Sequence, residues 1–325
     1  MQLLYRYFNG NHYTSIYDDG TRIRETIDPE DNKFTYDFAE NVDVLITKKC
    51  DANCSYCHEN ANINGKHGDL NLPIFNTWHP GTEMAIGGGN VFEHPNLFSF
   101  LNRLKDKKVI ANVTVNQKHI ELNYNKILYL LENNLIRGLG ISLTDSKSKD
   151  IEYIEKLCKI SNNVVIHTIA GILTDKDIDF LTNKKVLILG YKDNVGRGIL
   201  YKNKYNKDIL NKIKWLRDNI NNLKNRFRVL SFDNLALAQL DIKNKLNVSD
   251  KEWGMRFQGK DYGAITDPNP PSTFYLDTVN KTIARSSTQP YEQRVPYIGQ
   301  SFREAFRDSL KTYCINSSEY GELKK

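Results

Sequence analysis

The sequence predicts an α/β fold built around a parallel sheet. Over residues 42–191, six short runs rich in β-branched residues alternate with longer charged segments whose apolar residues recur at helical spacing. Such alternation is typical of βαβ units and a parallel sheet. Six units form either a partial barrel or an open doubly wound sheet. In both arrangements the chemistry belongs at the carboxyl ends of the strands.

The first predicted element is an antiparallel β-meander in residues 3–25. Asn9-Gly10 and Asp19-Gly20 separate the alternating runs LLYRYF, HYTSIY and TRIRE. Both dipeptides favour the positive φ angles of tight hairpin turns. We therefore expect three short strands ahead of the α/β region.

Six strands and four intervening helices follow. The predicted strands are VDVLIT (42–47), EMAIGG (83–88), VIANVTV (109–115), LGISL (139–143), VVIHTIA (164–170) and KVLILGY (185–191). The helical segments are HPNLFSFLNRLKDKK, YNKILYLLENNL, SKDIEYIEKLCK and TDKDIDFLTN. Each of these four has apolar residues at helical spacing.

The alternation ends after residue 191. A long basic helix is predicted from Asp208 to Asn225, and FRVLSF is a candidate strand. DPNPPS (267–272) is irregular because proline lacks an N–H and restrains the residue before it. TFYLDTVNKTIARSS predicts a hairpin that turns near Asn280. Without a clear linker, we expect one domain in three segments: a meander (1–41), a core (42–200) and a C-terminal α+β extension (201–325) packed on the core.

Composition indicates a soluble protein in a reducing compartment. The 325 residues include 45 basic and 39 acidic residues, a formal net charge of +6, which permits an anionic partner without requiring one. No stretch approaches the roughly 20 apolar residues of a membrane span. We expect no signal peptide and no membrane partner. Five cysteines, three of them clustered, indicate a metal rather than disulfides, so we expect a cytoplasmic location.

The clustered cysteines form the pattern C-x3-C-x2-C, with Cys50, Cys54 and Cys57 just past the first strand of the alternating region. Structural zinc is the first alternative, but it usually takes two ligand pairs, and neither His58 nor His67 completes a second pair. An iron–sulfur cluster is the second. A [4Fe–4S] cluster normally has four cysteine ligands, so three leave one iron with an open position.

With Tyr56 before the third cysteine, this motif resembles the radical S-adenosylmethionine (radical SAM) superfamily. The resemblance implies a partial (β/α)6 TIM-like barrel, with S-adenosylmethionine chelated at the open iron of an oxygen-sensitive [4Fe–4S] cluster. It implies reductive cleavage of S-adenosylmethionine to a 5′-deoxyadenosyl radical that abstracts hydrogen from a substrate. An electron donor such as flavodoxin or ferredoxin is also implied. Substrate specificity is expected outside residues 42–200.

A second motif, AIGGGNVFEHP (85–95), resembles the family's Gly-Gly-Glu segment, which contacts the amino group of the cofactor. Glycines permit close approach of a ligand to the backbone. This chain has Asn90 where the family commonly has Glu, and Glu93 is the nearest carboxylate. The matching cofactor-binding positions are Tyr56, Gly87, Gly88, Gly89 and Asn90.

Two later segments match the family at further strand ends. Ser142 and Thr144 lie where the family places a polar side chain against the cofactor, although strand-end capping explains them equally well. Leu189 and Gly190 match positions that flank the adenine. Nearby basic and polar side chains are either anion binders or solvated loop residues: Lys192, Asn194 and Arg197.

The substrate is left open, with three hypotheses for the chain as a whole. Besides a radical SAM enzyme, CSYCHEN suggests a glycyl-radical-enzyme activase, and a zinc or nucleic-acid-binding module is the non-enzymatic alternative. The lack of a second cysteine cluster disfavours peptide-modifying subfamilies with auxiliary clusters. Basic residues on and near the long helix suggest an anionic substrate such as a nucleotide or nucleic acid: Lys202, Lys204, Lys207, Lys212, Lys214, Arg217, Lys224, Arg226 and Arg228. His58 and Glu59 are candidates for proton transfer, and residues 253–274 for a substrate lid or a loop that covers the core.

Overall fold

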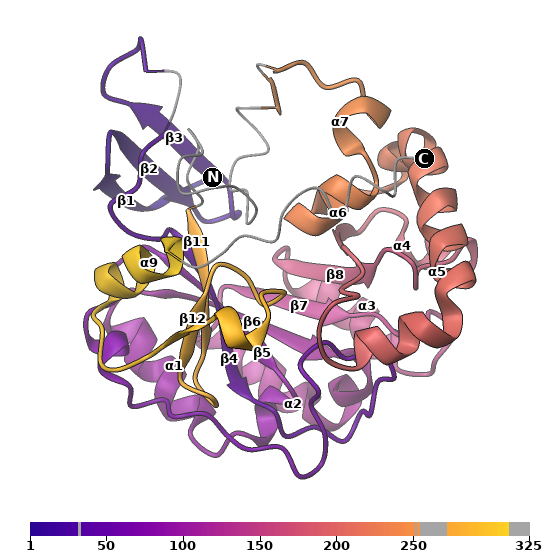
Figure 1. Cartoon of the computed structure of the whole chain (residues 1–325), viewed down its shortest axis with the longest axis horizontal. Helices are drawn as coiled ribbons and strands as arrows, with labels where there is room; N and C mark the ends of the chain where they lie inside the picture. The colour runs from indigo at the N-terminus through magenta and orange to yellow at the C-terminus, as the bar shows by residue number, and fades with distance from the viewer. Residues whose placement is uncertain (32–33, 251, 254–271, 312–325) are drawn as a thin grey trace.

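The computed structural model describes residues 1–31, 34–250, 252–253 and 272–311 (Figure 1). Cys314 and nearly all of the segment interpreted as a lid lie outside these ranges, as does most of the proline-rich stretch. No helix among the described residues is both long enough and apolar enough to cross a bilayer.

One large sheet dominates the molecule and confirms the partial-barrel prediction. Its ten strands follow the order β10-β9-β8-β7-β6-β5-β4-β11-β12-β13, and every pair from β10 to β11 is parallel. In the described residues, the two outermost strands do not pair with each other, so the sheet is not a closed barrel. The strand bounds are β4 (Asn41–Thr47), β5 (Glu83–Gly88), β6 (Ile110–Asn116), β7 (Gly138–Ser142), β8 (Val164–Ile169), β9 (Lys185–Leu189), β10 (Val229–Phe232), β11 (Thr273–Asp277), β12 (Thr282–Ala284) and β13 (Val295–Pro296).

Strict alternation gives the sheet two different faces. Along β6, Ala111, Val113 and Val115 are buried in the core, whereas Asn112, Thr114 and Asn116 line a cavity on the opposite face. Successive side chains of a strand point to opposite faces, so this period of two makes the inner face polar. In β4 the division is less sharp, because Val42 and Ile46 are buried and Asp43 lines the cavity, but Leu45 is buried and also lines it.

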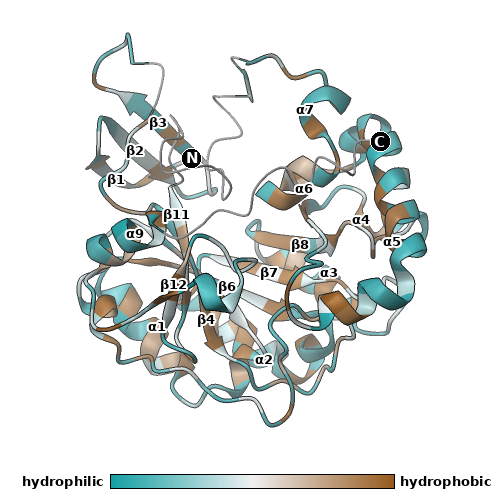
Figure 2. Cartoon of the chain, viewed as in Figure 1, coloured by the Kyte–Doolittle hydropathy of each residue, from teal (hydrophilic) through white to brown (hydrophobic). Residues whose placement is uncertain are grey.

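Helices cover the apolar face of the sheet, and their hydrophobic residues turn inward (Figure 2). In α1, Leu97, Phe100, Leu101 and Leu104 are buried at helical spacing. The helices are α1 (Leu97–Asp106), α2 (Ile120–Glu132), α3 (Ile151–Ile160), α4 (Ile178–Leu181), α5 (Gly196–Leu223), α6 (Asn234–Gln239), α7 (Ile242–Lys245) and α9 (Phe302–Leu310). The described residues also form short 3-10 helices, which are η1 (Pro73–Asn76), η2 (Val91–Glu93), η3 (Gln117–His119), η4 (Asp175–Asp177), η5 (Lys224–Arg226) and η6 (Tyr291–Gln293).

Helix α5 differs from its prediction. It begins at Gly196 rather than Asp208, with a kink at Tyr205, and runs along the right-hand edge of the view in Figure 1. The loop expected around Lys192, Asn194 and Arg197 is therefore partly the first turn of this helix. Gly196 has a φ of +58°, which a glycine adopts readily, so the glycines here start a helix rather than extend a loop.

The C-terminal segment completes the sheet. β11 pairs in parallel with β4, more than 220 residues earlier in the chain, and β12 pairs antiparallel with β11. The predicted hairpin near Asn280 is thus confirmed. On the far side of β9, FRVLSF supplies β10, which extends the six-strand core by one parallel strand.

The N-terminal meander forms a separate three-stranded sheet, as predicted: β1 (Leu3–Asn9), β2 (His12–Tyr17) and β3 (Arg22–Thr26). A fully buried carboxylate, Glu40, joins it to the start of β4. Arg24 donates to Glu40 through Nε at 2.8 Å and Nη2 at 2.6 Å, and His12 Nε2 lies 3.2 Å away. Arg22 bridges Glu40 and Glu83, at 3.5 and 3.2 Å.

Candidate active site at the carboxyl end of the sheet

The polar inner face of the sheet encloses a cavity of about 890 Å³. Cys50, Cys54 and Cys57 line one end of it, just beyond the carboxyl end of β4. The structure therefore brings the three predicted metal ligands together where a parallel α/β fold places its active site.

The first turn of α5 holds the cysteine loop from one side. The backbone N–H of Arg197 donates to Cys57 O at 2.9 Å. Its side chain donates through Nε to Cys54 O and through Nη2 to Ala61 O, both at 2.9 Å. A Cβ on Gly196 would lie 2.2 Å from His58 O, so only glycine permits this approach. Arg197 was a candidate anion binder, and instead it uses these donors to fix the loop.

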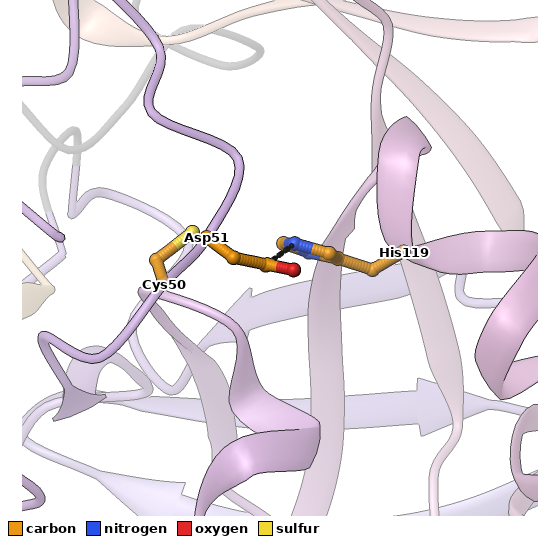
Figure 3. A group of neighbouring side chains, drawn as sticks. All are labelled: Cys50, Asp51 and His119. Carbon is orange, nitrogen blue, oxygen red and sulfur yellow. Dashed lines mark hydrogen bonds and ion pairs between the residues drawn. The ribbon is translucent and has the colours of Figure 1, made fainter. Parts of the chain in front are cut away.

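The turn after β6 holds the loop from the opposite side. Asn116 Nδ2 donates to Cys54 Sγ at 3.6 Å, and Lys118 Nζ donates to Ala52 O at 3.1 Å. The ring of His119 faces Asp51, with Nε2 and Oδ1 separated by 2.7 Å (Figure 3). We name residues 116–119 the clamp turn, because three of its side chains hold the loop.

The electrostatics of the thiols favour a bound cation. Burial raises the pKa of Cys50, and the neighbouring thiols Cys54 and Cys57 raise it further. Burial and Cys57 likewise raise the pKa of Cys54. Several thiolates are thus unfavourable here without a metal, whose positive charge deprotonates a coordinating thiol.

A second ligand set overlaps the first. In the described residues, the ligand atoms of Cys50, Asp51 and His119 all lie within 4.8 Å of one another (Figure 3). However, Asp51 and His119 already pair with each other, and this pairing accounts for their proximity. A three-thiol site uses all the cysteines at this end of the cavity and leaves the Asp51–His119 pair intact.

The glycine triplet forms the adjoining edge of the cavity, and its members differ. A Cβ on Gly88, whose φ is +122°, would lie 2.4 Å from Thr47 O, and one on Gly89 would lie 2.3 Å from Lys49 O. Gly87 has no atom within 4 Å of the corresponding position. Gly88 and Gly89 thus permit close strand packing, whereas Gly87 leaves open space in the cavity.

The structure places neither Asn90 nor Glu93 among the described residues that line this cavity. Asn90 is buried, and its side chain accepts a hydrogen bond from the Phe92 N–H at the start of η2. Glu93 pairs with Lys49 at 3.4 Å. The acidic side chains that do line the cavity are Asp19, Asp43, Glu59, Glu83 and Asp233.

A row of side chains crosses the inner face beside the cysteine loop. Asn116 pairs in register with Ser142, Ser142 with His167, and His167 with Leu187, and all four line the cavity.

The other predicted cofactor-binding positions differ in their contacts, and of these Leu189 also lines the cavity. Thr144 instead donates to Gln117 Oε1, and the Gly190 N–H donates to Asp233 Oδ1 at 2.8 Å. Tyr56 packs edge-on against Tyr201, with ring centroids 5.6 Å apart.

A charged network begins directly after Cys57, at His58 and Glu59. Glu59, only 7% exposed, accepts hydrogen bonds from Tyr275 Oη at 3.1 and 3.2 Å, and His58 Nε2 lies 3.1 Å from it. Lys192 Nζ lies 3.1 Å from His58 Nε2 and donates to Ser287 Oγ at 2.7 Å. Asn194 donates to Thr288 O at 3.1 Å. Lys192 and Asn194, like Arg197, are therefore held by protein atoms.

Two cavity residues were not singled out from the sequence. Desolvation within the cavity raises the pKa of Asp43 to about 6 and lowers the pKa of the half-buried His167 to about 4. Each is a polar residue in a strand that is otherwise apolar and β-branched. A check of every second position over residues 42–47 and 164–170 would have shown these two polar residues in the sequence.

Only the first turn of the long basic helix borders this cavity within the described residues, through Arg197. Among the described lining residues there is none of the basic residues named for it, from Lys202 through Arg228. Lys212 pairs with Asp208 at 2.8 Å, and Arg226 pairs with Asp179 at 2.9 Å. The basic residues named for this helix therefore do not form part of the cavity wall, and the anionic substrate that they suggested stays a prediction.

Comparison with known proteins identifies the fold. No protein-family model and no curated protein sequence matches the chain. The fold is similar to that of SuiB from Streptococcus suis. With the precursor peptide SuiA bound, the TM-score is 0.57 at 12% identity, over 89% of this chain and 67% of SuiB. For the SuiB structure with S-adenosylmethionine bound, the TM-score is 0.54 at 11% identity, over 89% of this chain and 68% of SuiB. For the structure of SuiB alone, the TM-score is 0.50 at 11% identity, over 77% of this chain and 61% of SuiB.

Proposed function

We propose that the chain is a radical SAM enzyme. Its thiols Cys50, Cys54 and Cys57 would hold a [4Fe–4S] cluster whose fourth iron binds S-adenosylmethionine. When bound, the cluster and S-adenosylmethionine together supply a 5′-deoxyadenosyl radical that abstracts hydrogen from a substrate. The observation that carries the proposal is the convergence of three thiols at the carboxyl end of an open parallel sheet, beside a glycine edge with free space at Gly87.

The chain's own residues would position the cofactors and exclude water. Arg197 and the clamp turn fix the cysteine loop from two sides, so the ligands are preorganised. The open space at Gly87 would let a ligand approach the backbone of this edge closely. The surrounding cavity encloses the reacting groups, as a reactive radical requires.

The likeness to SuiB supports this proposal, because one structure of that fold holds S-adenosylmethionine. The other holds a precursor peptide, so peptides join nucleotides as substrates to test. We further propose that a small redox protein of the flavodoxin or ferredoxin type supplies the electron. Clustered free thiols suit the reducing cytoplasm.

The test is anaerobic reconstitution of the full chain with iron and sulfide. We expect about four irons per chain and broad visible absorption. Reduced protein given S-adenosylmethionine should release 5′-deoxyadenosine. Binding of zinc with no iron, or iron binding with no S-adenosylmethionine cleavage, would overturn the proposal.

A further inference from the structure

The cavity does not end at the cysteine loop but continues to the amino ends of the strands. There it is lined by Arg137 just before β7, Lys185 at the start of β9, and Arg22 and Arg24 of the meander. From Arg137 to Ser142 the chain advances five residues, or about 16 Å at the rise of a β-strand. The two ends of the cavity are therefore separated by the length of an extended molecule.

The basic residues at this far end fall into two groups. Arg22 and Arg24 are neutralised by ion pairs with Glu40, and Arg22 also pairs with Glu83. Within the described chain, the side chains of Arg137 and Lys185 have no hydrogen bond or ion pair. The Nε atom of Arg137 is fully buried without a partner. A buried guanidinium nitrogen without an acceptor is costly, and such a group needs an explanation.

The local electrostatics carry an excess of positive charge. Burial lowers the pKa of Lys185, and the charges of Arg228 and Arg137 lower it further, whereas Asp19 raises it. Arg228 donates to Asn162 Oδ1 at 3.1 Å, a neutral partner that leaves its charge uncompensated. Asp19 is the one neighbouring carboxylate in this balance, and its Oδ1 accepts from the Thr21 N–H. An oxyanion between Arg137 and Lys185 would offset the excess positive charge.

We propose that Arg137 and Lys185 bind an oxyanion, carboxylate or phosphate, at one end of an elongated substrate. The reacting part of that substrate would lie beside Asn116 and Ser142, about 16 Å along the strands from Arg137. A planar guanidinium matches either anion through two parallel hydrogen bonds, and the lysine adds a second charge. This assignment rests on the proposed function for the role of the cysteine end, but anion binding itself needs no cluster.

The test measures binding of defined anions to the full chain by calorimetry at low salt. The phosphate arm uses adenosine monophosphate and adenosine, and the carboxylate arm uses tetraglycine with a free or an amidated carboxyl terminus. We expect saturable binding of the anionic member of one pair and at least about tenfold weaker binding of its neutral analogue. The pair whose anionic member binds shows whether the site takes a phosphate or a carboxylate.

Variants then locate the site. Arg137→Gln and Lys185→Gln should each weaken binding about tenfold or more, whereas Lys212→Gln on α5, which removes the same charge, should not. Arg137→Lys, which keeps the charge, should recover part of the loss. Each variant must match the parent in thermal unfolding temperature. No saturable binding of either anion, or equal affinity in Arg137→Gln and the parent, would overturn the inference.

Binding should persist in Cys50→Ala, which lacks a cluster ligand. Persistence there separates this site from the proposed function, because a chain that fails to cleave S-adenosylmethionine would still bind the anion. Loss of binding in Cys50→Ala with an unchanged unfolding temperature would contradict a site at the far end of the cavity.

Discussion

The three thiols at the cavity end are the residues on which the proposed chemistry depends. Replacing Cys50, Cys54 or Cys57 with Ala should reduce the iron content of reconstituted protein to background, because the remaining two ligands cannot hold the cluster. Cys158 is the matched control, since it lies half-buried on α3, away from the cavity lining. Iron and sulfide analysis checks this, and Cys314→Ala should also retain iron. Loss of iron in Cys158→Ala would contradict a site made of the clustered cysteines alone.

Substitutions at two adjacent glycines should have different effects. A side chain at Gly87 enters open space, so Gly87→Val should fold, retain its iron and bind S-adenosylmethionine at least about tenfold more weakly by filling the cavity edge. At Gly88 the same change drives a Cβ against Thr47 O at a φ of +122°, so it should lower the unfolding temperature as well. Equilibrium dialysis with S-adenosylmethionine and thermal unfolding separate the two effects. Equal loss of stability in both variants would show that Gly87 is structural.

His167 provides a pH test at the residue scale. Burial lowers the pKa of His167 to about 4 in the folded chain, whereas its pKa in the unfolded chain is about 6.5. Between pH 6.5 and pH 4, therefore, the unfolded chain binds a proton at this residue and the folded chain does not. The folded state consequently loses stability as the pH falls through this window. His167→Gln should lose less stability than the parent between pH 6.5 and 4, as measured by urea unfolding. Identical pH slopes would show that the imidazole is solvated when the chain is folded.

At the scale of elements, the clamp turn would act on the proposed cluster through one hydrogen bond. Asn116 donates to Cys54 Sγ, and such a donor stabilises the reduced, more negative cluster. In Asn116→Ala the midpoint potential should therefore fall by roughly 40 mV, the one-electron equivalent of about 1 kcal/mol. Redox titration monitored by electron paramagnetic resonance checks this. Ser142→Ala, in register but without a recorded contact to sulfur, is the control. An unchanged potential in Asn116→Ala would exclude the role.

Elements with a local signal were predictable from the sequence. The six core strands are β-branched runs, and the predicted bounds of 83–88 match β5 as observed. Asn-Gly and Asp-Gly marked the meander turns for the same reason, since their backbone preference is local. The start of α5 was missed because a glycine with positive φ at its first residue resembles a loop signal.

Features that depend on distant contacts were not predictable. The insertion of β11 beside β4 joins segments separated by more than 220 residues, and no local pattern encodes that pairing. Likewise, the sequence located the cysteines, but the packing of α5 decided that Arg197 holds their loop. Asn90 lay in the right segment yet faces η2, because a short helix needs an N-terminal cap.

For the molecule as a whole, the buried carboxylate Glu40 couples the meander to the core sheet. Hydrogen bonds from His12 and Thr14 and the charges of Arg24 and Arg22 outweigh burial and hold its pKa well below the usual range. Glu40→Gln leaves Arg24 without its counter-charge and Arg22 paired with Glu83 alone, so we expect a loss of about 3–5 kcal/mol in the free energy of unfolding. Glu25→Gln is the control. Glu25 pairs with Arg6 at 3.4 Å on the surface, with side chains 57% and 51% exposed, and its replacement should cost less than about 1 kcal/mol.

The pH dependence of the same variant tests the cause. A carboxyl group whose folded pKa is depressed stabilises the fold fully above its unfolded pKa, near 4.3, and loses that contribution as the pH falls toward the folded value. The difference in unfolding free energy between the parent and Glu40→Gln should thus be constant from pH 8 to 5 and shrink below about pH 4. Urea unfolding across this range measures it. A difference that stays constant at low pH would assign the loss to packing of the amide rather than to the buried charge.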